Sequence, residues 1–350
     1  MKNIFKYIIL SAAVIFTTSC ARLVTEGANE NIKRYLDAWL EVNTISKDSK
    51  IGRGVYVMEY DQIHENGLTV QSNGYAIVEY KILDLQGNIT DGTNWETADQ
   101  LGTLVPGNYY GPQVWTTTPE TIRAGLLDGI MGMKLQERKK FLVPAWLMSY
   151  QNYETEEEYF EETSDASTTI FDVKVVDFTM DINEWQFVKM IREFNKDSFY
   201  NGRFKGTSME DTVGVSYGMF YKTITEVAAE EAFKSDTTIY INYVGKLVDG
   251  HVFDTNIRKV ALDNDLPIEG RTFAPVSIQW SEEYSGIRMN DSEVIPGFSK
   301  TLMQMAKLRK GSKGLGMFYS ELGYSYSGTS SIPGYAPLIF EIEFVDKPEE

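Results

Sequence analysis

The sequence contains very little cysteine and histidine. Cys20 is the only cysteine, and His64 and His251 are the only histidines, among 350 residues. One cysteine cannot form an intrachain disulfide or a cysteine-based metal cluster, and two histidines are too few for the common histidine metal centres. Two histidines also give no basis for predicting a serine–histidine–acid catalytic triad. We therefore expect neither a metal nor another cofactor.

Basic residues are also in the minority. The chain has 33 Lys and Arg against 50 Asp and Glu, a net charge of −17. Such a polyanion has no electrostatic reason to bind nucleic acid or anionic lipid head groups. The glycine-rich stretch 311–316 has neither the Walker nor the dinucleotide spacing, so it predicts a hairpin rather than a phosphate site.

The N-terminus has the pattern of an export signal. Lys2 and Lys6 precede an apolar run, Tyr7–Phe16, that is too short to cross a bilayer as a helix. Two small residues then lead to Cys20, as in bacterial lipoprotein signals, although Thr17 stands where those signals have an apolar residue. We favour cleavage before Cys20 and lipid on its thiol, because the chain's only cysteine lies where that chemistry needs it. The alternative is an ordinary secretory signal with an incidental cysteine. Either way we expect a cell-envelope protein, and lipidation would tether it to a membrane, at the outer membrane or the periplasmic face.

Apolar periodicity predicts the same construction in both halves of the chain. Phe340, Ile342 and Phe344 alternate with glutamates as in a half-buried strand, and Phe298 and Leu302 belong to one stripe of a helix. The first half repeats these patterns, and each half has an amphipathic helix before its first strand. The predicted stripes are Ile32, Tyr35, Leu36 and Trp39 in the first helix, and Phe187, Val188 and Ile191 in the second. The fold class is therefore α+β, in two similar units.

Several motifs of the second half occur in the order found in one known family. Tyr243 on a strand, an Asp249-Gly250 turn and Phe253-Asp254 are followed by Val294-Ile295-Pro296-Gly297-Phe298 and a short helix. This order resembles the FKBP family of peptidyl-prolyl cis-trans isomerases over roughly the last third of the chain. The resemblance implies a curved antiparallel sheet wrapped on a short helix, and the internal repeat extends that expectation to the first half.

The resemblance also implies a binding pocket. The matching positions are wall aromatics at Tyr243, Phe253 and Phe340, a floor at Phe298, an apolar edge at Val294 and Ile295, a hydroxyl at Tyr324, a carboxylate at Asp254 and an apolar loop residue at Ile332. The backbone N–H of Ile295 and the Tyr324 hydroxyl would hold the ligand. Taken singly, each residue is better explained structurally, as core, strand or turn cap. Their joint order favours a pocket.

The first half departs from the family at three positions. Thr90 replaces the pocket phenylalanine, Arg123 stands in the place of Ile295, and Met148 (or Tyr150, with a shift in register) stands in the place of Tyr324. Tyr80, Asp91 and Phe171 persist. We interpret this half as a scaffold or protein-binding module without an isomerase pocket.

The predicted boundaries follow from these patterns. They are a signal at 1–19, tether and helix at 20–50, a degenerate FKBP-like domain at 51–180, linker helix and loop at 181–210, and an isomerase domain at 211–346. Thr255–Ala274 and Ser281–Ser292 are expected insertions at the pocket rim. Tyr150–Thr163 is expected to be a solvated acidic loop, and His251 a solvated turn residue.

Two functions from different classes fit these features. The first is an exported, lipid-anchored prolyl isomerase that assists the folding of proline-containing clients. The second is a non-catalytic docking subunit or chaperone of a cell-envelope assembly that uses both FKBP-like domains as surfaces. A glycan-binding or nutrient-uptake lipoprotein ranks third, because only the anchor and the aromatic residues favour it.

Overall fold

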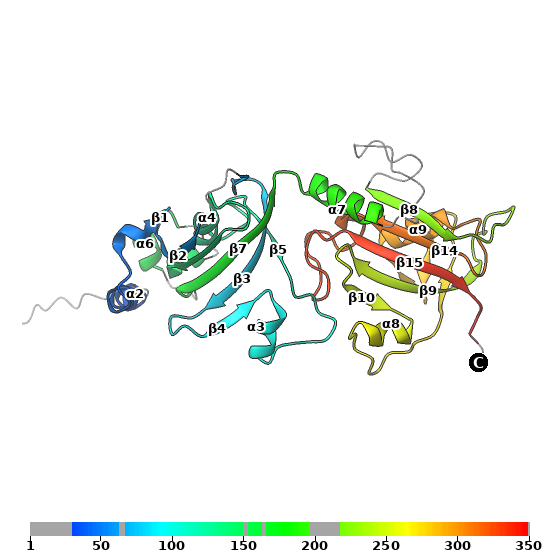
Figure 1. The fold of residues 1–350 in the computed structure, drawn as a ribbon, viewed down its shortest axis with the longest axis horizontal. Helices are drawn as coiled ribbons and strands as arrows, with labels where there is room; N and C mark the ends of the chain where they lie inside the picture. The colour runs from blue at the N-terminus through cyan, green and yellow to red at the C-terminus, as the bar shows by residue number, and fades with distance from the viewer. Residues whose placement is uncertain are drawn as a thin grey trace, which may run out of the picture.

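The computed structural model describes residues 30–62, 67–149, 151, 153–162, 166–196 and 218–348. Two lobes lie side by side along the long axis, each built around one antiparallel sheet (Figure 1). The predicted signal peptide, Cys20, the tether before residue 30 and linker residues 197–217 lie outside the described residues. No helix among the described residues has the length and apolar character needed to cross a membrane.

The first sheet has seven strands within the described residues, in the order β1-β2-β6-β7-β3-β4, with β5 also paired to β3. These strands are β1 (Lys50–Ile51), β2 (Val55–Asp61), β3 (Tyr75–Leu83), β4 (Ile89–Gly92), β5 (Gln113–Thr116), β6 (Arg138–Val143) and β7 (Thr169–Thr179). The helices of this half are α2 (Glu30–Val42), η1 (Lys47–Ser49), α3 (Trp95–Gln100), α4 (Ala124–Ile130), α5 (Ala145–Met148) and α6 (Glu156–Phe160).

The second sheet has eight strands within the described residues, in the order β13-β12-β11-β9-β15-β14-β8, with β10 also paired to β9. These strands are β8 (Met219–Thr225), β9 (Thr238–Leu247), β10 (Val252–Thr255), β11 (Val276–Gln279), β12 (Arg288–Met289), β13 (Ser292–Glu293), β14 (Lys313–Phe318) and β15 (Leu338–Val345). The helices are α7 (Ile182–Lys196), α8 (Arg258–Asp263), η3 (Tyr284–Gly286), α9 (Pro296–Gln304) and η4 (Ser320–Leu322).

The two sheets share one pairing order, so the predicted repeat is confirmed. Strands β2, β6, β7, β3, β4 and β5 correspond to β8, β14, β15, β9, β10 and β11. The register also agrees: Ile82 pairs with Phe171 in the first sheet, and Gly245 pairs with Phe340 in the second. Residues that match between the halves therefore occupy equivalent places.

A short helix lies in each concave face. In the second half Phe298, Leu302 and Met305 are 0–2% exposed and pack with the sheet. The helix can approach closely because Gly297 has no side chain: a Cβ there would lie 2.2 Å from Phe318 Cδ2. Gly125 of α4 has the same role, since a Cβ would lie 2.1 Å from Val143 Cγ1. Burying both apolar faces in one core stabilises this α+β arrangement.

The helix before each sheet packs on the convex face. Leu36 and Leu40 of α2 cover Leu142 and Ile170, and Phe187 and Met190 of α7 cover the equivalent pair on β14 and β15 (Figure 1). The prediction of Val188 on the buried stripe was wrong. Val188 is 39% exposed, because the buried side of α7 runs through positions 182, 186, 187 and 190, and position 188 lies on the opposite side.

Two predicted loops contain regular structure. Within the predicted acidic loop, residues 156–160 form the short helix α6, capped by Thr155, which turns Tyr159 into the first core at 1% exposure. The prediction of a solvated loop therefore holds for the exposed glutamates 154, 157, 158, 161 and 162 but is wrong for Tyr159, and Glu156 is half-buried beside Lys33. The insertion Ser281–Ser292 adds β12 beside β11, and its Ile287 is 1% exposed in the second core.

Candidate functional site

Four aromatic rings gather between the second sheet and α9. The ring of Phe340 lies 5.0 Å from that of Phe298, 5.6 Å from Phe253 and 6.3 Å from Tyr243, measured between centroids. The two closer pairs meet edge to face, an arrangement that aromatic rings favour. Tyr243 and Phe253 keep only 8% and 9% of their surface exposed. The predicted wall and floor residues thus gather in one water-poor aromatic cluster, at the place of the predicted hollow.

Gly245 makes room for this packing on the sheet. A Cβ at this position would lie 2.7 Å from Phe253 Cε2 and 2.9 Å from Phe340 Cε1, closer than real contacts allow. Only glycine therefore lets the Phe253 ring lie against β9.

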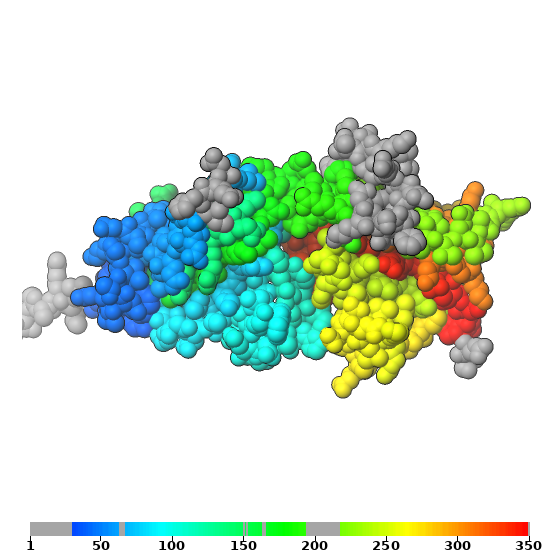
Figure 2. All heavy atoms as spheres, viewed as in Figure 1, coloured from blue at the N-terminus to red at the C-terminus, as the bar shows by residue number. Residues whose placement is uncertain are grey.

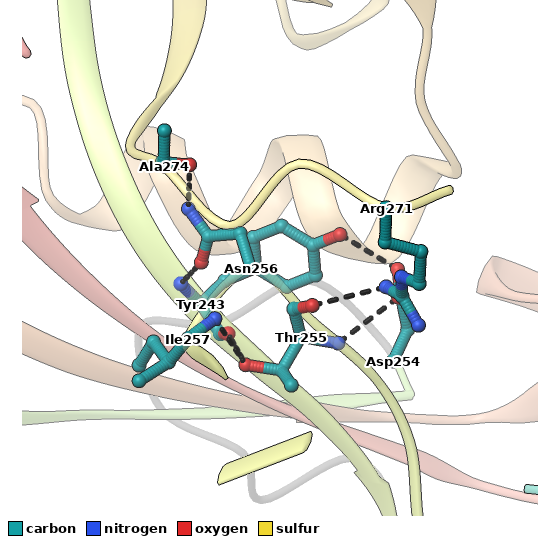
Figure 3. A network of polar contacts seen from close by, with 7 residues as sticks. All are labelled: Tyr243, Asp254, Thr255, Asn256, Ile257, Arg271 and Ala274. Atoms are coloured by element: carbon teal, nitrogen blue, oxygen red, sulfur yellow. Dashed lines mark hydrogen bonds and ion pairs between the residues drawn. The ribbon is translucent and has the colours of Figure 1, made fainter. Parts of the chain in front are cut away.

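A carboxylate orients the tyrosine at one wall. The Tyr243 hydroxyl donates to Asp254 Oδ2 at 2.6 Å, and Arg271 donates to Asp254 Oδ1 and to the Thr255 carbonyl oxygen (Figure 3). Burial, reinforced by the Asp254 charge, raises the pKa of Tyr243 well above its usual value. The hydroxyl therefore stays protonated at neutral pH and keeps donating to Asp254.

Asn256 fixes the chain as it leaves β10. Its Oδ1 accepts the Tyr243 N–H at 2.8 Å, and its Nδ2 donates to the Ala274 carbonyl oxygen (Figure 3). The same Nδ2 also donates to the Ile241 carbonyl oxygen. The Thr255 hydroxyl donates to the Tyr243 carbonyl oxygen at 2.7 Å. These bonds join the first insertion, which begins here, to the strand that carries Tyr243.

Two donors at the edge of the hollow have no acceptor within the described residues. They are the backbone N–H of Ile295, which caps α9, and the hydroxyl of Tyr324. Tyr324 is 37% exposed, and burial of its ring beside Asp254 raises its pKa, so the hydroxyl is a donor at neutral pH. Val294 and Ile295 are half-buried, and Ile332 packs into the core at 2% exposure.

The first sheet fills the equivalent hollow differently. Ile82 stands where Gly245 stands, and its half-buried side chain packs on the first core, while Thr90 in the place of Phe253 is exposed. Trp115 lies 5.3 Å from Tyr80 and 6.4 Å from Phe171, centroid to centroid. Within the described part of the chain, the Tyr80 hydroxyl makes no hydrogen bond to Asp91. Tyr150 lies outside the described residues, and Met148 is 9% exposed.

Sequence reasoning missed three residues of this region. Arg271 and Asn256 lie in an insertion without periodicity, and Gly245 lies within a strand pattern. A glycine inside a strand is a known signal of close approach and could have been recognised. His251 was predicted to be solvated, which is wrong: it is half-buried, its Nε2 is enclosed, and its ring meets that of Tyr109 at 5.7 Å.

Comparison with known proteins finds a family match within the second unit. Residues 229–345 match the family model described as FKBP-type peptidyl-prolyl cis-trans isomerase. The FKBP-type isomerase FkpA of Escherichia coli is 28% identical over 131 residues, covering 37% of this chain and 38% of the relative. The isomerase FKBP11 of Bos taurus is 31% identical over 121 residues, covering 34% and 46%. The chain thus spans less than half the length of these relatives.

Solved structures show partial likeness. The crystal structure of FkpA from Escherichia coli has a TM-score of 0.29 at 25% identity, covering 47% of this chain and 58% of that chain. The three FKBP domains of wheat FKBP73 have a TM-score of 0.28 at 15% identity, covering 87% and 98%. The fold described above rests on the strand pairing of this chain.

Proposed function

We propose, because residues 229–345 belong to the FKBP-type peptidyl-prolyl cis-trans isomerase family, that the second unit isomerises X-Pro bonds of exported client proteins in its aromatic hollow. At the level of the family, the match supports isomerase activity and assistance to folding. The hollow as the client site, the inactivity of the first unit and the export of the protein are parts of the proposal.

The chemistry requires no covalent step. Rotation about a prolyl bond crosses a barrier of about 18–20 kcal/mol and takes tens to hundreds of seconds without a catalyst. The twisted amide has lost resonance and carries less separated charge than the planar one, so a water-poor aromatic hollow favours it. Lowering the barrier by roughly 8 kcal/mol would accelerate rotation about a million-fold. A preshaped apolar site with fixed donors can supply a stabilisation of this kind.

The observation that carries the proposal is the pair of unused donors beside the aromatic cluster. An N–H at Ile295 and a hydroxyl at Tyr324 lack acceptors among the described residues, so both donors are available to a bound peptide. In our proposal they hold the carbonyl groups that flank the client proline. The proline ring contacts the edges of Tyr243 and Phe253, with Phe298 below and Phe340 between them. Val294, Ile332 and the Asp254–Tyr243 bond fix the shape of the site.

The first unit is proposed to be inactive. Ile82 replaces the glycine that admits the Phe253 ring, and Thr90 offers no aromatic wall. It would act as a scaffold or protein-binding module.

The anchor remains a proposal because Cys20 lies outside the described residues. Lipid on the Cys20 thiol would keep both units at a membrane surface while they stay in water. The mass of the N-terminal peptide of the mature protein tests this: a mass without acyl chains rejects it.

The second candidate function is a non-catalytic docking subunit. The observation that favours it is the depth of burial of the rings, since 8–9% exposure at the walls leaves little surface for a proline. In that case both units would bind partner proteins through their surfaces, and the Tyr324 hydroxyl would take no part in catalysis.

A protease-coupled assay of the full chain on short proline peptides separates the candidates. We expect acceleration by the native protein, and a loss of about 5- to 30-fold in kcat/KM for Tyr324→Phe, the effect of one hydrogen bond of about 1–2 kcal/mol. Tyr326→Phe is the matched control, because Tyr326 is in the same loop and 70% exposed. If the native protein does not accelerate isomerisation, the isomerase proposal is rejected.

A further inference from the structure

A loop of the first unit lies on the second unit. The cross-domain loop, residues 101–112, joins α3 to β5 and reaches the segment that carries the rim of the hollow. The backbone N–H of Tyr109 donates to the Ser330 carbonyl oxygen at 3.0 Å. The Tyr109 ring also meets His251 edge to face and packs on the second core. One end of this loop is therefore docked against residues 325–335.

The same loop touches the opposite rim. Gly107 lies against Leu266 and Pro267 of the insertion 255–274, so that a Cβ on Gly107 would be 3.1 Å from a side-chain carbon of each. Figure 2 shows atoms of the first unit in contact with those of this insertion. The insertion supplies Arg271 to Asp254, so the loop spans the two segments that border the hollow.

Hydrogen bonds within the cross-domain loop also fix its conformation. The Val105 N–H donates to the Tyr110 hydroxyl at 2.8 Å, and the Asn108 N–H donates to the Val105 carbonyl oxygen at 3.2 Å. Tyr75 of the first sheet adds a second contact, 5.4 Å from the ring of Tyr335, between centroids. A loop that is itself ordered can add a further restraint to both rim segments.

We propose that Gly107 and Tyr109 are positioning residues, through which the first unit fixes both rim segments of the second unit's hollow and sets its affinity for clients. This rests on the isomerase function proposed above. A site whose rim is already ordered loses less conformational entropy when a peptide binds than one whose rim must be ordered at that moment. The degenerate unit would then contribute to the activity without a pocket of its own.

The test uses the full chain with two matched pairs of variants. Tyr109→Ala removes the ring, and Tyr109→Phe keeps it. Gly107→Ala adds a methyl group at φ +81° against Leu266 and Pro267, whereas Gly102→Ala adds one at φ +67° in open space of the same loop. Both glycines of the second pair have a positive φ, and only the methyl group at position 107 meets neighbouring side chains. KM and kcat on a short proline peptide are measured, together with hydrogen exchange of residues 325–335.

We expect Tyr109→Ala and Gly107→Ala to raise KM about 5-fold with kcat within 2-fold, and to speed exchange of residues 325–335 by at least 10-fold. Tyr109→Phe and Gly102→Ala should behave like the native chain. Native KM and native exchange in both disruptive variants would overturn the proposal. If the native chain shows no isomerase activity, the proposed function fails, and the exchange rates alone then decide whether the loop fixes the rim.

Discussion

Replacing Gly245 and Phe253 by the residues at the equivalent positions of the first unit tests whether these two side chains compete for the same space on the sheet. Gly245→Ile places a branched side chain where even a Cβ would lie 2.7 Å from Phe253, so we expect overpacking to cost about 1–3 kcal/mol. Phe253→Thr removes a ring that is only 9% exposed, and we expect a loss of about 3–5 kcal/mol. Together the changes copy Ile82 and Thr90 of the first unit.

The double variant should be more stable than the sum of the single effects predicts. Isoleucine would fill part of the volume that the ring vacates, so we expect a favourable coupling of at least about 1 kcal/mol. Hydrogen exchange of β15 amides measures the stability of the second unit separately from the first. The double variant should also lack isomerase activity, because the aromatic wall is gone. Additivity within about 0.5 kcal/mol would refute the idea that the two side chains compete for one space.

Two further predictions concern stability. Burial lowers the pKa of Lys139 to about 8, below its unfolded value of 10.5, so the unfolded chain binds more protons and the free energy of unfolding should rise by roughly 2 kcal/mol from pH 8 to 10. Urea unfolding of Lys139→Met should show no such rise, and equal pH profiles for the variant and the native chain would contradict the explanation. The two are compared below pH 10, because the pKa of Tyr60 is raised to about 12 and its stabilising contribution begins to fall above that pH. Asn256→Ala should cost about 2–4 kcal/mol, because it leaves buried backbone groups of Ile241, Tyr243 and Ala274 unpaired. The exposed control Asn264→Ala loses a single bond to Val260 and should cost less than about 1 kcal/mol, and equal losses would be inconsistent with this explanation.

Much of the fold was predictable because its pattern is local. Alternation along 338–345 and the stripe through Phe298, Leu302 and Met305 fix which faces are buried, and a strand period of two fixes the register once one face is known. The repeat then carried this expectation to the first unit. The aromatic members of the site follow from the same faces, which is why they meet at 5.0–6.3 Å as expected.

The misses share a different cause. Tyr159 stands in a run of glutamates, and its burial depends on the Thr155 cap and on Tyr153, whose ring lies 5.2 Å away. Val188 was assigned to the wrong side because it was grouped with Phe187 and Ile191, whereas the buried side of the helix runs through positions 182, 186, 187 and 190. Arg271 reaches Asp254 from seventeen residues away along a loop. Such contacts depend on the tertiary path of the chain, which carries no periodic signal.

The two units have similar sheets, so a comparison of their side chains indicates which residues the hollow of the second unit requires. Both sheets have one pairing order, one helix in the concave face and one on the convex face, so neither architecture nor register separates them. One difference lies at a pair of equivalent positions, which hold glycine and phenylalanine in the second unit but isoleucine and threonine in the first. A side chain at position 245 of β9 would occupy the space that the Phe253 ring now fills. Exchanging this pair would therefore change the packing at the hollow while the strand pairing of the sheet stays the same.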